Sequence, residues 1–212
     1  MTRNYFRYIV YLIVIFTVSL SHAGAYEDFF LAINRDDGDT VRALVHRGLY
    51  PNSRSPEGQT ALHLALRDQL PRVAEALWAS PALEVDAVNG SSETPLMMAA
   101  LRGDLAWAQR LVGRGARIHR DGWSPLHYAA TGNEPRIVAL LLDRGAPINA
   151  PSPNRSTPLM MAARYGAEAN VDLLLARGAD RRLRNDRDLD AGAFAKLAGR
   201  DVLSQRLDAA PR

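Results

Sequence analysis

One short pattern recurs along this chain: a hydroxyl residue, then Pro or Ala, Leu, His or Met, any residue, and Ala. It occurs at Thr60–Ala65, Thr94–Ala99, Ser124–Ala129 and Thr157–Ala162. The copies follow one another at a nearly constant spacing of about 33 residues, and self-similarity at such a period is typical of a solenoid. The sequence therefore predicts one supersecondary unit that is stacked repeatedly on its neighbours.

A second pattern follows the first at a constant distance. Leu111–Ala116, Leu141–Ala146 and Leu174–Ala179 each end in Gly-Ala, and each begins at the same offset from the preceding Thr or Ser. The two patterns together, at their shared period, resemble the ankyrin repeat. The resemblance covers the chain from about Tyr26 to the C-terminus and implies an all-α ankyrin-repeat solenoid. Its units would be stacked helix-turn-helix pairs joined by short β-hairpin or finger loops.

The repeats suggest one domain over residues 24–212. It would hold an N-terminal capping repeat at about 26–52, full repeats at about 53–86, 87–119, 120–149 and 150–182, and a degenerate capping repeat at about 183–212. The first and last units lack the hydroxyl-Pro-Leu opening. That departure suits terminal repeats, which stack on one neighbour only and present their other face to water.

The N-terminus resembles a secretory signal peptide, residues 1–23. Two arginines precede the apolar run Tyr8–Leu20, and small residues at Ala23 and Ala25 follow it. This order of basic, apolar and small residues is the export signature, and we expect cleavage after Ala23 or Ala25. The alternative is an uncleaved anchor over residues 8–25, whose uncharged stretch approaches the length of about 20 residues that a spanning helix needs.

Composition limits the functions that this chain supports. The formal charge is +3, but two of the 26 basic residues precede residue 24, so a processed chain would carry 24 basic and 23 acidic residues, or +1. Such a balance offers no broad basic footprint for nucleic acid. The absence of cysteine excludes disulfides, thiolate zinc sites and thiol catalysis.

Two histidines, His63 and His127, occupy the same position of the repeated pattern, where Met97 and Met160 stand in the other copies. The exchange of His for Met argues for a packing role, and the family resemblance implies a hydrogen-bonding residue at the helix start. No His pair has metal-ligand spacing, and the acidic residues form no pair in an apolar setting. We therefore predict no catalytic residue, no metal and no cofactor, and a protein that is not an enzyme.

The resemblance implies that the fingers and the inner faces of the first helices form a concave binding groove. Two positions after the Ala-Ala of each motif should face it, together with the finger residue before Ser124. The predicted partner-binding residues are Arg67, Leu101, Arg102, Trp123, Thr131, Arg164 and Tyr165. Aromatic residues and arginines are typical of binding hot spots. The alternative is an ordinary solvated face with scattered apolar residues.

Details within the repeats carry three more predictions. The hydroxyl of Thr60 should cap a free backbone N–H at the start of its helix. Trp78–Ala82 stands where Leu-x-x-Gly-Ala is expected, and Gly is the usual left-handed C-cap, so we expect an irregular turn and the weakest junction of the stack. The shortest step between copies, from Thr94 to Ser124, predicts a shortened finger that carries Trp123.

These observations favour a non-enzymatic protein-protein interaction module, exported to the bacterial periplasm or secreted. It would bind a protein or peptide partner, for which an acidic character is one hypothesis. After cleavage it would act as a monomer without membrane contact. A membrane-anchored adaptor held by residues 8–25 is the alternative. An enzyme or a nucleic-acid binder is the least favoured hypothesis.

Overall fold

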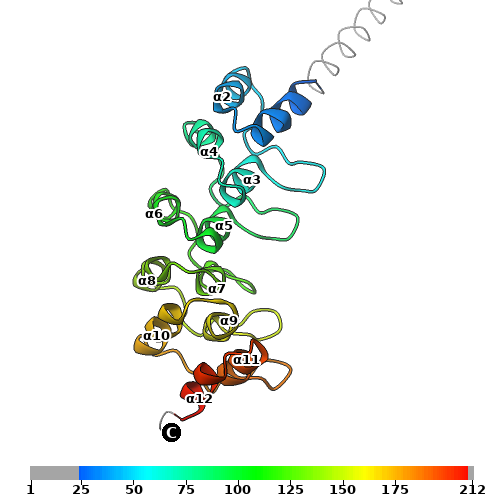
Figure 1. Cartoon of the computed structure of the whole chain (residues 1–212). Helices are drawn as coiled ribbons and strands as arrows, with labels where there is room; N and C mark the ends of the chain where they lie inside the picture. Colours follow the sequence, from blue (N-terminus) through cyan, green and yellow to red (C-terminus); the bar gives the residue numbers. More distant parts are fainter. Residues whose placement is uncertain (1–23, 210–212) are drawn as a thin grey trace, which may run out of the picture. The chain divides into compact units, whose positions relative to one another are not determined.

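A computed structural model describes residues 24–209, and all the named elements in this range are helices (Figure 1). The chain divides into two compact units, with the boundary between Leu83 and Glu84. The expected signal peptide, residues 1–23, lies outside the described residues. Within residues 24–209, no helix has the length and apolar character that crossing a membrane requires. The predicted all-α repeat architecture is confirmed, while the predicted domain and repeat boundaries stay predictions.

The first unit contains two helix pairs within the described range. Residues 24–34 are helical and precede α2 (Gly38–His46), and α3 (Ala61–Arg67) precedes α4 (Pro71–Trp78). Helix α4 packs against both α2 and α3, and Ile33, Leu62 and Leu77 are fully buried. The carboxylate of Asp36 accepts the backbone N–H of Val73 at 2.9 Å, so the first pair caps a helix of the second.

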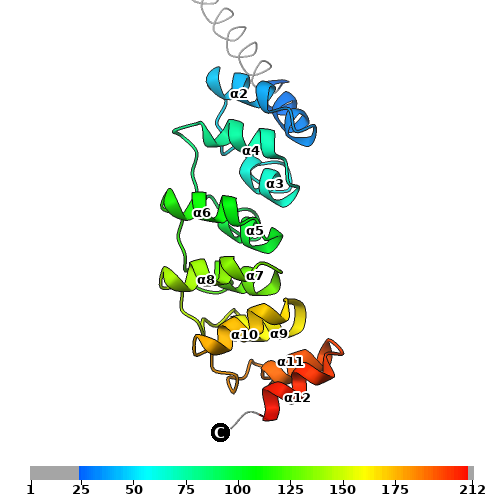
Figure 2. The same ribbon diagram turned by 60° about the vertical axis from the view of Figure 1, so that its left-hand side comes forward.

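The second unit repeats the same pairing. The first helices α5, α7, α9 and α11 pack in sequence, and α6, α8 and α10 pack in a second layer beside them (Figure 1 and Figure 2). Helix α12 closes this unit against α11. The bounds are α5 (Pro95–Arg102), α6 (Leu105–Gly113), α7 (Pro125–Thr131), α8 (Pro135–Asp143), α9 (Pro158–Tyr165), α10 (Glu168–Ala176), α11 (Ala191–Leu197) and α12 (Asp201–Ala209).

The motif's hydroxyl residue is the N-cap of the first helix in every full repeat. Thr94 and Thr157 accept the backbone N–H of the third helical residue at 3.3 and 3.4 Å. Pro follows both without loss, because the first helical position needs no donor. The prediction was wrong for Thr60: its hydroxyl bonds Nδ1 of His63 at 2.7 Å and caps no backbone N–H.

The exchange of His for Met has a specific physical basis. Met97 and Met160 each accept the backbone N–H of their own N-cap residue through sulfur at 3.3 Å. His127 accepts the equivalent N–H through Nδ1 at 3.2 Å. Each side chain therefore completes a reciprocal capping box. The position requires a buried acceptor, and the two residue types supply it with different chemistry.

The second helices end in two different ways. Four of them, α2, α6, α8 and α10, are followed by a glycine with a positive φ of 102°, 93°, 87° and 89°, at Gly48, Gly115, Gly145 and Gly178 respectively. After α4, the residue that follows the C-cap is Ser80 in place of glycine, and its φ is not positive. The hydroxyl of buried Ser80 accepts the N–H of Ala82 at 3.3 Å. The amide of Asn52 donates to the Ala82 carbonyl at 2.9 Å. The irregular turn is confirmed, and the boundary between the units directly follows it.

Each finger of ordinary length is a loop closed at its base by a backbone hydrogen bond, with a second one inside the turn. The closing N–H and carbonyl lie four residues apart, in the pairs Ser55 and Gln59, Asn89 and Glu93, Ser152 and Ser156, and Asn185 and Leu189. The residue two before the helix N-cap has a positive φ in each described finger, at Gly58, Ser92, Gly122, Arg155 and Asp188. The left-handed turn is thus a property of the finger, and only two of these copies use glycine for it.

Candidate functional site

The first helices of the second unit carry a periodic set of side chains, seven and eight residues after each motif begins. We call this set the inner row: Leu101, Arg102, Thr131, Gly132, Arg164, Tyr165 and Leu197. Several members are unusually exposed for apolar residues, with Tyr165 56% and Leu197 55% accessible. Exposed large apolar side chains that recur on one face mark a surface available to a partner.

Three of the predicted site residues meet around one hollow. A cavity of about 230 Å³ is lined by Leu101 of α5, Trp123 of the shortened finger, His127, Tyr128 and Thr131 of α7, and Met161 of α9. We call it the Trp123 hollow. The His127 ring meets the indole of Trp123 edge-on, with centroids 5.3 Å apart and planes at 78°. The walls therefore come from three consecutive repeats.

His127 forms the base of this hollow as a neutral ring. Its Nδ1 accepts the Ser124 N–H, so Nε2 carries the proton and donates to the Ser156 carbonyl at 3.0 Å. Burial lowers the pKa of His127 from 6.5 to about 4, against the opposing effect of the Ser156 carbonyl. With both nitrogens engaged, the ring has no lone pair left for a metal or a proton transfer. The structural role that the resemblance implied is the one observed.

Tyr128 forms a second wall and is held by the neighbouring finger. Its hydroxyl donates to Oε1 of Glu93 at 2.7 Å, while Asn89 donates to the other carboxylate oxygen at 2.7 Å. Burial, reinforced by Glu93, raises the pKa of Tyr128 well above its usual value. The tyrosine therefore stays protonated and presents its ring, not its hydroxyl, to the hollow.

The predicted arginines fall into different settings. Within residues 24–209, Arg102 is exposed and forms no hydrogen bond or ion pair. The guanidinium carbon of Arg164 lies 5.1 Å from the ring centroid of Tyr165 and 5.9 Å from that of Phe194, within cation–π range. Arg67 lies in the first unit, where it bonds Asp68 at 2.8 and 2.7 Å. The other six predicted residues belong to the second unit.

Sequence reasoning missed three residues of this surface. Tyr128 and Met161 stand four positions after the motif begins, and Leu197 continues the inner row in the last repeat. The signal was available, because residues three apart on a helix share a face. Position four therefore lies beside position seven, where Thr131 and Arg164 stand.

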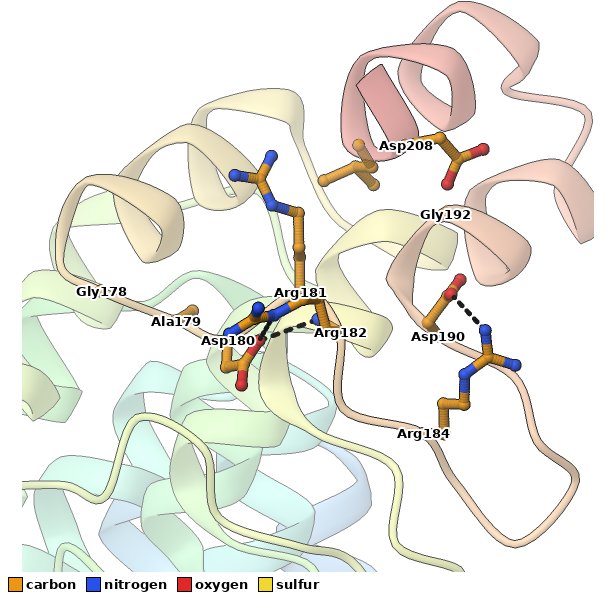
Figure 3. Close-up of a pocket in the computed structure, with 10 residues that line it drawn as sticks. Gly178, Ala179, Asp180, Arg181, Arg182, Arg184, Asp190, Gly192 and Asp208 are labelled. Carbon is orange, nitrogen blue, oxygen red and sulfur yellow. Dashed lines mark hydrogen bonds and ion pairs between the residues drawn. The ribbon is translucent and has the colours of Figure 1, made fainter. Parts of the chain in front are cut away.

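A larger hollow of about 740 Å³ lies at the C-terminal end of the second unit (Figure 3). Three arginines and three aspartates line it, with glycine, alanine and leucine: Arg181, Arg182, Arg184, Asp180, Asp190 and Asp208. Arg182 pairs with Asp180 at 3.4 Å and Arg184 with Asp190 at 3.5 Å. These opposite charges balance, so the hollow has no net charge to attract an ion. Sequence reasoning overlooked it because the repeated pattern decays there.

The described residues include no group of three or more His, Asp or Glu side chains placed to hold a metal ion. The hydrogen-bonded rings of His127 and Tyr128 dominate the polar chemistry of the Trp123 hollow. What the second unit offers a ligand is therefore an apolar recess beside the exposed Arg102 and the half-buried Arg164.

A family model described as "Ankyrin repeats (3 copies)" matches residues 29–121 and 96–185. The B-cell lymphoma 3 protein homolog of Mus musculus is 34% identical over 154 residues, which is 69% of this chain and 34% of that protein. SH3 and multiple ankyrin repeat domains protein 2 of Homo sapiens is 29% identical over 184 residues, 82% of this chain and 10% of that protein. Ankyrin repeat protein nuc-2 of Neurospora crassa is 32% identical over 142 residues, 65% of this chain and 13% of that protein. The chain thus spans about a third of the mouse relative and less of the other two.

Proposed function

Because the chain belongs to the ankyrin-repeat family, we propose that it is a non-enzymatic protein-interaction module, exported to the bacterial periplasm. It binds a protein or peptide partner along the inner row of the second unit. The observation that carries this proposal is the Trp123 hollow, an exposed apolar recess with Arg102 and Arg164 in the same row. Aromatic and arginine side chains around a recess are the usual make-up of a binding hot spot.

A pull-down from the native envelope fraction tests the binding role. The informative variant is Arg102→Glu combined with Arg164→Glu, which reverses the charge of the inner row. The matched control is Arg47→Glu with Arg144→Glu, because both of these exposed arginines follow second helices. We expect the first double variant to lose its partner and the control to keep it. A partner retained by both variants would refute binding at the inner row.

Export rests on the N-terminal sequence alone. A basic start, the apolar run Tyr8–Leu20 and small residues through Ala25 support a cleaved signal peptide. Mass spectrometry of the chain from its native host distinguishes the two possibilities. A start at Gly24 or Tyr26 indicates export with cleavage, whereas an intact N-terminus favours the adaptor anchored by residues 8–25.

An enzyme or a nucleic-acid binder has less support. Both nitrogens of His127 are hydrogen-bonded within the protein, and a chain that starts at residue 24 carries a formal charge of +1. A charge this small gives little counterion release on binding DNA. Strong DNA retention that falls steeply with salt would favour a nucleic-acid partner.

A further inference from the structure

We infer that the Trp123 hollow seats one bulky apolar side chain of a partner peptide that carries an acidic residue beside it. This inference rests on the proposed function and specifies the partner that the inner row recognises. Three features carry it: the internal hydrogen bonds of the hydroxyls and of the imidazole in the walls, the size of the hollow, and the arginines without ion pairs in the same row.

The walls offer little hydrogen-bonding capacity to a ligand. The hydroxyl of Thr131 donates to the His127 carbonyl at 2.8 Å, and that of Tyr128 donates to Glu93 at 2.7 Å. His127 uses both ring nitrogens inside the protein. A polar group entering the hollow would lose water and find few partners beyond the indole N–H of Trp123, which is unfavourable. An apolar group loses only unfavourable hydration.

The size of the hollow favours a side chain over a separate small molecule. Pockets for drug-sized ligands usually measure about 300 to 1,000 Å³, and this one measures about 230 Å³. A large aliphatic or aromatic side chain suits such a space, while the rest of its peptide lies across the inner row. The walls are held by hydrogen bonds from adjacent repeats, at Glu93 and Ser156. Little ordering is therefore needed when the side chain enters.

The charges of the inner row determine which partner residues are favoured next to the apolar side chain in the hollow. Arg102 directly follows Leu101, and Arg164 lies three residues after Met161, so an arginine accompanies a wall residue in α5 and in α9. Neither arginine forms an ion pair within the described part of the chain. The nearby carboxylate of Glu93 accepts from the neutral groups of Tyr128 and Asn89 and keeps its charge. That one negative charge offsets only one of the two arginines.

The shortened finger does not alter this balance, because its Arg120 and Asp121 offset one another in charge. The inner row therefore keeps an excess of positive charge from Arg102 and Arg164. Complementary charge guides partner choice more than it raises affinity. A partner with Asp or Glu next to its apolar anchor fits this row.

Neighbouring repeats provide substitutions that the helix framework already tolerates. Thr131→Arg copies Arg164, which stands at the equivalent position of α9, and fills the hollow with a charged side chain. Trp123→Ser copies Ser156 and removes one wall. Val202→Thr serves as the control, because Val202 of α12 is exposed and lies outside both the inner row and the hollow. Circular dichroism and thermal unfolding confirm that each variant is folded.

The experiment selects a random dodecapeptide library, displayed on phage, on the purified full chain. We expect the enriched peptides to share a Leu, Ile, Met, Phe or Trp with Asp or Glu within two positions. Synthetic versions should lose at least about tenfold in affinity on Thr131→Arg, on Trp123→Ser and on replacement of their own apolar residue by Ala. Val202→Thr should leave the affinity unchanged.

The other outcomes overturn the inference in distinguishable ways. Peptides that depend on Arg102 and Arg164 but tolerate Thr131→Arg would leave the proposed function standing and refute the hollow. Peptides indifferent to every inner-row variant would refute both. If the enriched peptides lacked acidic residues, or if no peptide were enriched, the inference that the partner pairs an apolar side chain with an acidic residue would be refuted. Self-association of the wild-type chain that Thr131→Arg abolishes would identify a second copy as the occupant instead.

Discussion

Helices α7 and α9 begin with the same motif and pack against each other, yet their repeats use it differently. At the capping position α7 has His127 and α9 has Met160, and each accepts the N–H of its own N-cap residue. Only the histidine can take up a proton. The comparison shows that one local requirement, a buried acceptor, is met by residues that differ in pH response.

The fingers before these helices differ as well. Trp123 precedes the N-cap of α7, and Ser156 precedes that of α9. Ser156 is buried and its carbonyl accepts from His127, whereas Trp123 is 37% exposed and lines a hollow. The scaffold therefore constrains the helix starts closely and leaves the preceding finger position open to functional variation.

The largest expected difference in the free energy of unfolding is between variants of Gly166 and Gly132, the glycines that end α9 and α7. A Cβ on Gly166 would lie 2.1 Å from the Ala130 carbonyl oxygen and 3.0 Å from Cα of Ala162, both backbone atoms that cannot step aside. Gly166→Ala should therefore reduce the free energy of unfolding by more than about 3 kcal/mol. For Gly132 the nearest atom, the Ala100 carbonyl oxygen, lies at 3.1 Å, and Gly132→Ala should cost about 1 kcal/mol. Urea unfolding of both variants measures this, and equal losses would contradict the structural basis.

The next largest effect is the pH dependence of the free energy of unfolding that comes from His127. The pKa of His127 is about 4 in the folded chain and near 6.5 in the unfolded chain. As the pH falls from 6.5 to 4, the unfolded state binds a proton that the folded state does not, so stability decreases. The loss should approach roughly 3 kcal/mol at pH 4, and it is absent well above pH 6.5.

His127→Met should remove this component, because the sulfur of Met160 shows that Met keeps the cap. Urea unfolding at pH 7, 5.5 and 4 compares the wild type with the variant. All other titrating groups are common to both proteins and cancel in the difference. Parallel curves would show that His127 is protonated equally in the folded and unfolded states.

A smaller change in the free energy of unfolding is expected from the side chains that cap the C-termini of α7 and α9. The amide of Asn170 donates to the carbonyls of Ala129, Ala130 and Gly132 at 3.2, 3.2 and 2.8 Å, at the end of α7. Its Oδ1 is buried without a partner among the described residues, which offsets part of the gain. Asn170→Ala should therefore cost about 2 kcal/mol.

Arg200 plays the same part for α9, donating to the carbonyls of Ala162, Ala163 and Gly166 at 2.9 to 3.1 Å. Its side chain is 23% exposed, so water can replace the lost bonds and Arg200→Ala should cost about 1 kcal/mol. Thermal unfolding ranks the two variants. A larger loss for Arg200→Ala would contradict the difference in solvent access.

The smallest change in the free energy of unfolding is expected from substitutions in the finger turns. Gly122 and Arg155 stand at equivalent positions with φ of 79° and 60°. A left-handed non-glycine residue costs about 1 to 2 kcal/mol, but glycine loses more entropy on folding. Arg155→Gly should therefore stabilise the chain by about 0.5 kcal/mol, and Gly122→Ala should destabilise it by about 1 kcal/mol. Calorimetric unfolding resolves these signs, and a loss on Arg155→Gly would show that the Arg155 side chain stabilises the turn.

The candidate site was only partly accessible from the sequence. The repeat register placed Leu101, Trp123 and Thr131 on the binding side, and all three line the hollow. Tyr128 and Met161 were not identified, although each lies three residues before an inner-row residue on the same helix. That they line one hollow together with Leu101 depends on the packing of adjacent helices. Whether the site binds a partner stays a prediction.

Local sequence was enough to locate the repeat, the helix starts and the irregular turn at Trp78–Ala82, because capping, proline and glycine act within a few residues. The contacts that these residues make with neighbouring repeats became visible only in the stacked helices. Stacking placed Nε2 of His127 against the Ser156 carbonyl of the next repeat, gave Gly166 a role in close backbone approach, and assembled the Trp123 hollow from three repeats. Such contacts join residues of different repeats, so they depend on a packing geometry that no short stretch of sequence encodes.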